Sequence, residues 1–176
     1  MLKRAMLIVT LVVLAGFTLE STPASAEGQK IGVMNIQKVL LESSAGRKAK
    51  EVFEKRMNEL QEKFKKEQDS LVALQQEIEK KSSAWSKDKK SEKIRELQLG
   101  QRELQAKSQD AKMELKQLQD KELEPILKML QTVVNSYGEK NGYSVILDSK
   151  VAVLYADSSI DVSDALKAQL DKRMKK

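Results

Sequence analysis

Apolar residues in the middle of the chain recur at alternating steps of three and four, which is the spacing of a heptad seam between packed helices. Within 53–78 the seam comprises Phe53, Met57, Leu60, Phe64, Leu71, Leu74 and Ile78. After a polar break it resumes with Ile94, Leu97, Leu104, Ala111, Leu115 and Leu118. Two helices with matching seams and a short break predict an antiparallel coiled-coil hairpin. We assign it to residues 46–122, with its tip near 80–91.

The seam is incomplete at three places, where Glu67, Gln101 and Ser108 replace apolar residues. Gly100 lies beside one of them and weakens a helix locally. Two interpretations remain open. Either the polar places let the arm bend, or they are merely tolerated, since polar seam residues also fix register at a cost in stability.

The segments that flank the arm have strand-like and cap-like patterns. KIGVM (30–34) predicts a strand, and Asn35 is suited to cap a helical turn after it. After the arm, a wider apolar stripe predicts a helix that packs on a sheet, with Pro125 as a bend or a junction. Gly138 or Gly142 is suited to end that helix.

The C-terminal part of the chain predicts a β-hairpin followed by a helix. YSVILD (143–148) and VAVLYA (151–156) are rich in β-formers and are joined by only two residues. Asp161 and Ser163 are suited to cap a final helix. The fold class is therefore α+β, with a discontinuous β-rich body over 27–45 and 123–176.

A body this small rarely has a sufficient core without staples, and this chain of 176 residues has no cysteine. We therefore expect it to oligomerise through the sheet. The residues expected in this oligomer body are Ile31, Val33, Val145, Leu147, Val151, Val153 and Tyr155.

The first 26 residues have the layout of a cleavable signal peptide. Lys3 and Arg4 precede an apolar run over 5–17, and small residues stand at Ala24 and Ala26. The run is too short to cross a bilayer comfortably, since a membrane anchor requires ~20 apolar residues. We expect cleavage after Ala26, export, and a soluble product.

The composition argues against catalysis. The chain has neither histidine nor cysteine, so the commonest general base, the commonest metal ligand and every thiol nucleophile are absent. We expect no enzyme activity, no cofactor and no metal. Four acidic residues near the C-terminus lack the spacing of a calcium loop, and turns or helix caps explain them better. They are Asp148, Asp157, Asp161 and Asp164.

The basic excess is concentrated at the predicted tip. Residues 27–176 hold 30 basic and 25 acidic residues, a net charge of +5, while 80–95 alone holds seven basic and two acidic residues. The tip therefore predicts contact with anionic lipid headgroups or acidic segments, and a solvated cap is the alternative. The residues concerned are Lys80, Lys81, Trp85, Lys87, Lys89, Lys90, Lys93 and Arg95.

Three stretches resemble the Skp/OmpH family of periplasmic chaperones: KIGVMNIQKVL (30–40), GYSVILDSKVAVLYAD (142–157) and SIDVSDALKAQL (159–170). The resemblance implies a jellyfish-like trimer whose helical tentacles enclose a cavity. It also implies an ATP-independent holdase that keeps unfolded outer-membrane proteins soluble in transit through the periplasm. Trp85 at the tip departs from the family pattern.

Three apolar residues outside the seam are candidates for contacting clients along the arm: Val72, Leu99 and Met113. Two other functions are alternatives. Specific nucleic-acid binding is disfavoured, because the chain has no recognition fold and no aromatic platform on which bases could stack. A structural coiled-coil adaptor of the cell envelope, with one folded partner, remains the alternative.

Overall fold

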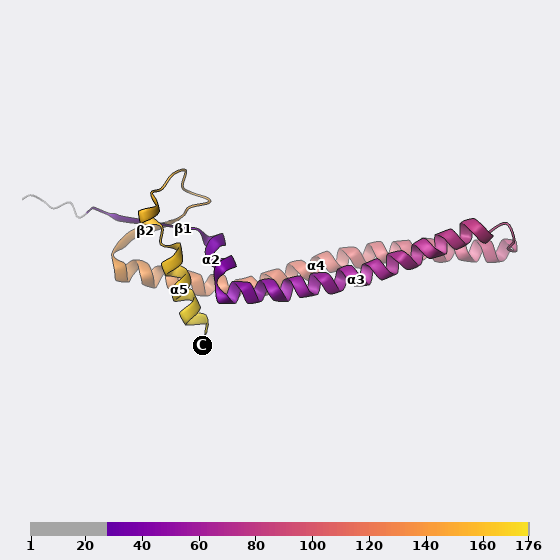
Figure 1. Ribbon diagram of the computed structural model, residues 1–176, viewed down its shortest axis with the longest axis horizontal. Coiled ribbons are helices and arrows are strands. Elements are labelled where there is room, and N and C mark those ends of the chain that lie inside the picture. The colour runs from indigo at the N-terminus through magenta and orange to yellow at the C-terminus, as the bar shows by residue number, and fades with distance from the viewer. Residues whose placement is uncertain (1–27, 176) are drawn as a thin grey trace, which may run out of the picture.

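The computed structural model describes residues 28–175, so the predicted signal peptide lies outside the described residues. Two short strands and four helices follow one another along the chain, with one 3-10 turn (Figure 1). The elements are β1 (Lys30–Met34), α2 (Ile36–Glu42), α3 (Ser44–Lys81), α4 (Lys87–Asn141), β2 (Tyr143–Asp148), η1 (Ser158–Ile160) and α5 (Ser163–Met174). None of the helices in this part of the chain is long and apolar enough to cross a membrane.

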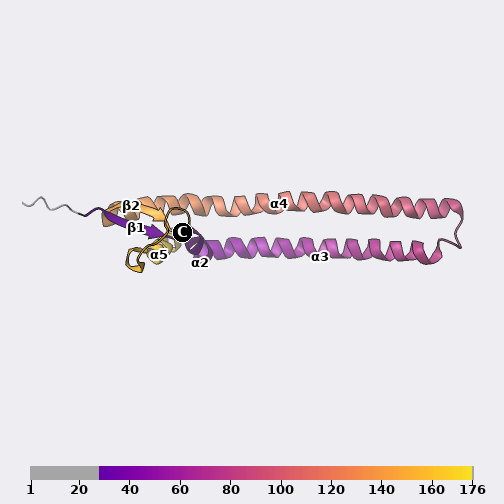
Figure 2. The same ribbon diagram turned by 90° about the horizontal axis from the view of Figure 1, so that it is seen from above.

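Helix α3 and the first two-thirds of α4 lie side by side, run in opposite directions and extend away from the other elements (Figures 1 and 2). We call this pair, residues 44–122, the arm. Its tip is shorter than the predicted 80–91, because α3 continues to Lys81 and α4 begins at Lys87. The Ser86 hydroxyl accepts a hydrogen bond from the Lys89 backbone N–H (3.3 Å), so it caps α4 earlier than predicted.

The less exposed residues of the arm follow the predicted seam on α3 and depart from it on α4. Every seam position from Phe53 to Ile78 is buried or half-buried, including Glu67. On α4, however, Ile94 and Gln101 are exposed, and Lys93 and Gly100 occupy the seam instead. The seam assignments of Ile94 and Gln101 were therefore wrong by one residue.

Gly100 allows a close approach of the two helices. A Cβ atom built on Gly100 would lie 2.5 Å from Leu71 Cδ2, so the Leu71 side chain occupies the space that any other residue would need. We predicted that Gly100 weakens the arm, whereas in the structure it is a packing position. This contact is invisible on either helix alone.

The body consists of the remaining elements and of α4 beyond residue 122. β1 and β2 pair in parallel, with Val33 opposite Leu147. The predicted hairpin between 143–148 and 151–156 was wrong, since the structure assigns no strand to 151–156. The Asp148 carboxylate accepts from the Lys150 N–H (2.9 Å) and the Asp148 carbonyl from the Ala152 N–H (3.0 Å). This turn directs the chain away from the sheet.

The core of the body lies where α5 packs between α4 and α2 (Figure 1). Its buried residues are Met34, Val39, Ala49, Ile126, Leu130, Val133, Val162, Leu166 and Leu170. Helix α4 runs through Pro125 without ending, and Ile126 next to it is its first buried residue in the core. Pro125 thus lies where α4 passes from the arm into the body.

The predicted caps hold at α2 and α4 but not at α5, whose N-cap residue is Val162 without a side-chain cap bond. The Asn35 side chain accepts from the Lys38 N–H (3.0 Å) at the start of α2, and Gly142 ends α4 with a φ of 69°. At α5 the Asp161 carboxylate accepts from the Ser163 N–H (2.8 Å). The buried Ser163 hydroxyl accepts instead from the Asn35 N–H (2.8 Å), which ties α5 to the end of β1.

Candidate interaction surfaces of the arm and body

Two ion pairs join the helices of the arm. The Arg56 guanidinium donates to Glu114 across the helices and to Glu59 on its own helix (3.0 Å). These bonds hold the pKa of the Glu114 carboxyl below its usual range and raise the pKa of Arg56. Near the middle of the arm, Lys107 Nζ lies 3.0 Å from the seam residue Glu67. Exposed pairs contribute little stability, so their main effect here is on register.

The eight predicted tip residues gather at the end of the arm far from the body (Figures 1 and 2). Lys81 pairs with Glu77 (3.1 Å), and Lys93 pairs with Glu96 (2.7 Å), which raises the pKa of Lys93. The Lys89 amine lies 5.5 Å from the centre of the half-buried Trp85 ring. Within residues 28–175 the remaining tip cations form no salt bridge: Lys80, Lys87, Lys90 and Arg95.

The three candidate client-contact residues are exposed on the arm. The exposed fractions are 45% for Val72, 51% for Leu99 and 57% for Met113. Val72 and Leu99 lie beside the Leu71–Gly100 contact, one on each helix, whereas Met113 lies next to the Glu114–Arg56 pair. The structure therefore spreads them along the arm and does not gather them into one patch.

The arm has a further apolar surface near the body, which the hydrophobic pattern did not predict. Exposed Val52 and half-buried Leu118 line a groove beside Arg56, with a volume of about 540 Å³. Val52 directly precedes the seam residue Phe53, so an apolar pair at the edge of the seam was the signal that could have found it.

The predicted oligomer residues differ in accessibility. Val33 is buried within the single chain, and Leu147 and Val153 are half-buried. The other four predicted residues are exposed: Ile31, Val145, Val151 and Tyr155. Leu154, which was missed, is fully exposed between Val153 and Tyr155. The sheet has only two strands, and the other edge of β1 is bridged where the Val33 carbonyl accepts from the Val162 N–H (2.9 Å). Among the described residues, β2 therefore leaves its outer edge without a strand.

Three of the four acidic residues near the C-terminus act in turns, as predicted. The carboxylates of Asp148, Asp157 and Asp161 each accept from a backbone N–H two residues later. Asp164 pairs with Lys38 (2.9 Å), which lowers the pKa of Asp164. Local turns therefore explain three of these residues, and an ion pair with α2 engages the fourth.

Comparisons with known proteins agree with this architecture. A protein called chaperone protein Skp from Pectobacterium atrosepticum is 22% identical over 156 residues, which cover 86% of this chain and 92% of that protein. Chaperone protein Skp from Yersinia enterocolitica is 25% identical, over 82% and 88% of the two chains. A crystal structure of an OmpH-like outer membrane chaperone from Caulobacter crescentus matches with a TM-score of 0.72 and 21% identity. That match covers 82% of this chain and 85% of the other, and it supports the same fold.

The family comparison spans most of the described chain. The family model described as outer membrane protein (OmpH-like) matches residues 30–170, from β1 to near the end of α5. It therefore includes both strands, the whole arm and the elements that build the core. The chain belongs to the OmpH-like outer membrane protein family.

Proposed function

We propose that this protein is a periplasmic holdase chaperone, which binds unfolded outer-membrane proteins and keeps them from aggregating without ATP. The observation that carries the proposal is the family match over the body and the whole arm, together with relatives named as chaperones. The structure adds a physical basis. An arm with scattered exposed apolar side chains and a largely charged surface suits weak contacts with many unfolded chains.

The proposed working form is a trimer with the arms around a central cavity. The open edge of β2 and the exposed Val151, Leu154 and Tyr155 support an interface between copies on the body. Three arms directed the same way would then place Val72 and Leu99 at one level of a cavity and Met113 at a second level nearer the body. Such a distribution suits an extended client better than a compact one.

Export follows from the sequence of residues 1–26, which we propose to be a signal peptide removed in the periplasm.

The alternative function is a structural adaptor of the envelope that binds one folded partner. A holdase suppresses aggregation of many unfolded proteins, whereas an adaptor does not, so a single assay separates the two.

The test is dilution of a urea-unfolded outer-membrane β-barrel protein into buffer containing residues 27–176, followed by light scattering without ATP. We expect suppression at about one trimer per client. The triple variant V72S/L99S/M113S is expected to suppress less, while L41S/L127S, which changes two exposed apolar residues near the body, serves as the control. Unchanged scattering with the wild-type protein would contradict the proposal and favour the adaptor.

We also propose that the tip contacts anionic lipid headgroups, which the unpaired cations beside Trp85 support. Co-sedimentation with vesicles containing phosphatidylglycerol should fall with rising salt. It should be lost in K80E/K87E/K90E and retained in a control with the same charge change elsewhere in the arm, K65E/K66E/K116E. Binding by the tip variant that persists at high salt would refute the electrostatic contact.

A further inference from the structure

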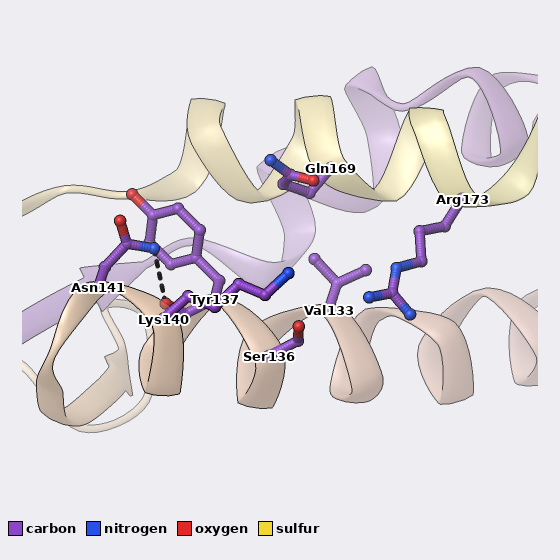
Figure 3. A pocket seen from close by; sticks show the side chains of 7 residues that line it. All are labelled: Val133, Ser136, Tyr137, Lys140, Asn141, Gln169 and Arg173. Atoms are coloured by element: carbon purple, nitrogen blue, oxygen red, sulfur yellow. Dashed lines mark hydrogen bonds between the residues drawn. The ribbon is translucent and has the colours of Figure 1, made fainter.

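A small cavity lies in the body between the last turns of α4 and the end of α5, far from the tip (Figures 1 and 3). Four of its residues stand on one stripe of α4, at the helical spacing i, i+3, i+4 and i+7: Val133, Ser136, Tyr137 and Lys140. Gln169 and Arg173 face them from α5, one turn apart. Because the buried Val133 belongs to the core that docks α5, the packing of the two helices fixes this arrangement.

Every polar side chain around the cavity can donate a hydrogen bond. Figure 3 shows the Lys140 amine and the Arg173 guanidinium reaching toward Val133 from opposite sides, with the Ser136 hydroxyl below and the Gln169 amide above. Of the seven lining residues none is acidic. The Asn141 amide is already engaged, since it donates to the Tyr137 carbonyl (2.7 Å). The arrangement thus offers two positive charges, a hydroxyl and an amide to one small space.

The nearby acids of α5 are turned to other partners. Asp171 accepts from the Ser44 N–H (2.7 Å) at the start of α3, and Asp164 pairs with Lys38 (2.9 Å). Within residues 28–175 neither Lys140 nor Arg173 takes part in a salt bridge. Two cations that share a cavity without a carboxylate repel one another, and a bound anion would relieve that repulsion.

We propose that this cavity binds a phosphate group. The volume of about 160 Å³ admits a small group and is well below the ~300–1,000 Å³ of sites for drug-sized ligands. A guanidinium and an amine suit phosphate, because charge-assisted hydrogen bonds from Arg and Lys to phosphate oxygens are short and strong. The phosphate is either free or part of a lipid headgroup. The inference is independent of the holdase proposal, because it concerns a different part of the molecule.

The test is titration of residues 27–176 with inorganic phosphate, with backbone amide NMR signals as the readout. We expect saturable shifts at Ser136, Lys140, Gln169 and Arg173. The variant K140Q/R173Q should raise the Kd by roughly tenfold or more, because it removes both charge-assisted hydrogen bonds to the phosphate. The control K116Q/K172Q removes the same charge from positions on the same two helices that do not line the cavity, and it should leave the Kd unchanged.

Two outcomes would overturn the proposal. One is a shift that grows linearly with phosphate and never saturates. The other is equal weakening in both variants, which would mean that the cations only attract anions generally or offset the partial negative charge at the helix C-termini. A second titration with a soluble short-chain phosphatidylglycerol identifies the source. The same shifts would assign a lipid headgroup, and their absence would assign the free anion.

Discussion

Replacing Gly46 by alanine tests the junction between α2 and α3, because helix propensity and the structure predict opposite results. Gly46 lies in the first turn of α3, where alanine is normally favoured over glycine by about 1 kcal/mol. In the structure, however, a Cβ atom on Gly46 would lie 1.5 Å from the backbone oxygen of Leu40. No side-chain rotation removes an overlap with backbone, so the junction must open.

The cost can be worked out from the bonds at this junction. The buried Ser43 hydroxyl donates to the Leu40 carbonyl (3.0 Å) and accepts from the Gly46 N–H (3.0 Å). Opening the junction removes this N-cap, at about 1 kcal/mol, and leaves a buried hydroxyl without partners, at about 1–3 kcal/mol. After the propensity gain of about 1 kcal/mol, we expect a net loss of about 1–3 kcal/mol.

The assay is urea unfolding at fixed chain concentration, followed by circular dichroism of the helices. G100A is the matched control, because its Cβ would meet only the end of the Leu71 side chain, which can rotate away. We expect a near-neutral effect for G100A and a clear fall of the midpoint for G46A. A G46A protein as stable as wild type would refute the reasoning.

Three further predictions concern the core, the arm and the proposed interface. L166A removes a fully buried side chain from the core and should lower the free energy of unfolding by about 2–5 kcal/mol in the same urea assay. Glu114 has its pKa held below 4.5 by Arg56, so the pair stabilises the arm above that pH and ceases to do so as the pH falls through the lowered pKa. Acid titration from about pH 6 to about pH 3 should therefore destabilise wild type more than E114Q; an identical pH profile would contradict this. L154K/Y155K places charge on exposed body residues and should reduce the mass measured by sedimentation, if they lie in the interface between copies.

The arm was predicted well because each of its helices buries one apolar stripe against one partner helix. This constraint appears in the sequence as apolar residues at alternating steps of three and four. The seam positions assigned to Ile94 and Gln101 were wrong by one residue, because packing against the facing helix determines which residues of α4 lie in the seam. Leu71 fills the space over Gly100, and hydrophobicity assigns no seam position to a glycine. The tip cluster was likewise predictable, since its residues are contiguous in the sequence.

The body was predicted less well because its contacts join distant segments. The composition of 151–156 is that of a strand, but a strand forms only beside a partner edge, and β2 pairs with β1 instead. The cavity beside Lys140 and Arg173 was missed for a similar reason. It exists only because α5 docks on α4, and nothing in the local sequence of either helix indicates the other.

The parallel pairing of β1 with β2 has a consequence for the order of folding. Lys30 is opposite Tyr143, so the sheet closes a loop of more than a hundred residues, a contact of very high sequence separation. The arm removes most of that separation, because zipping α3 onto α4 from the turn at 82–86 brings the two strands together through local steps. We therefore expect the two arm helices to pair first and so to bring β1 and β2 of the body together. Deleting equal lengths from α3 and α4 should leave the sheet intact, whereas shortening only one helix should slow its formation.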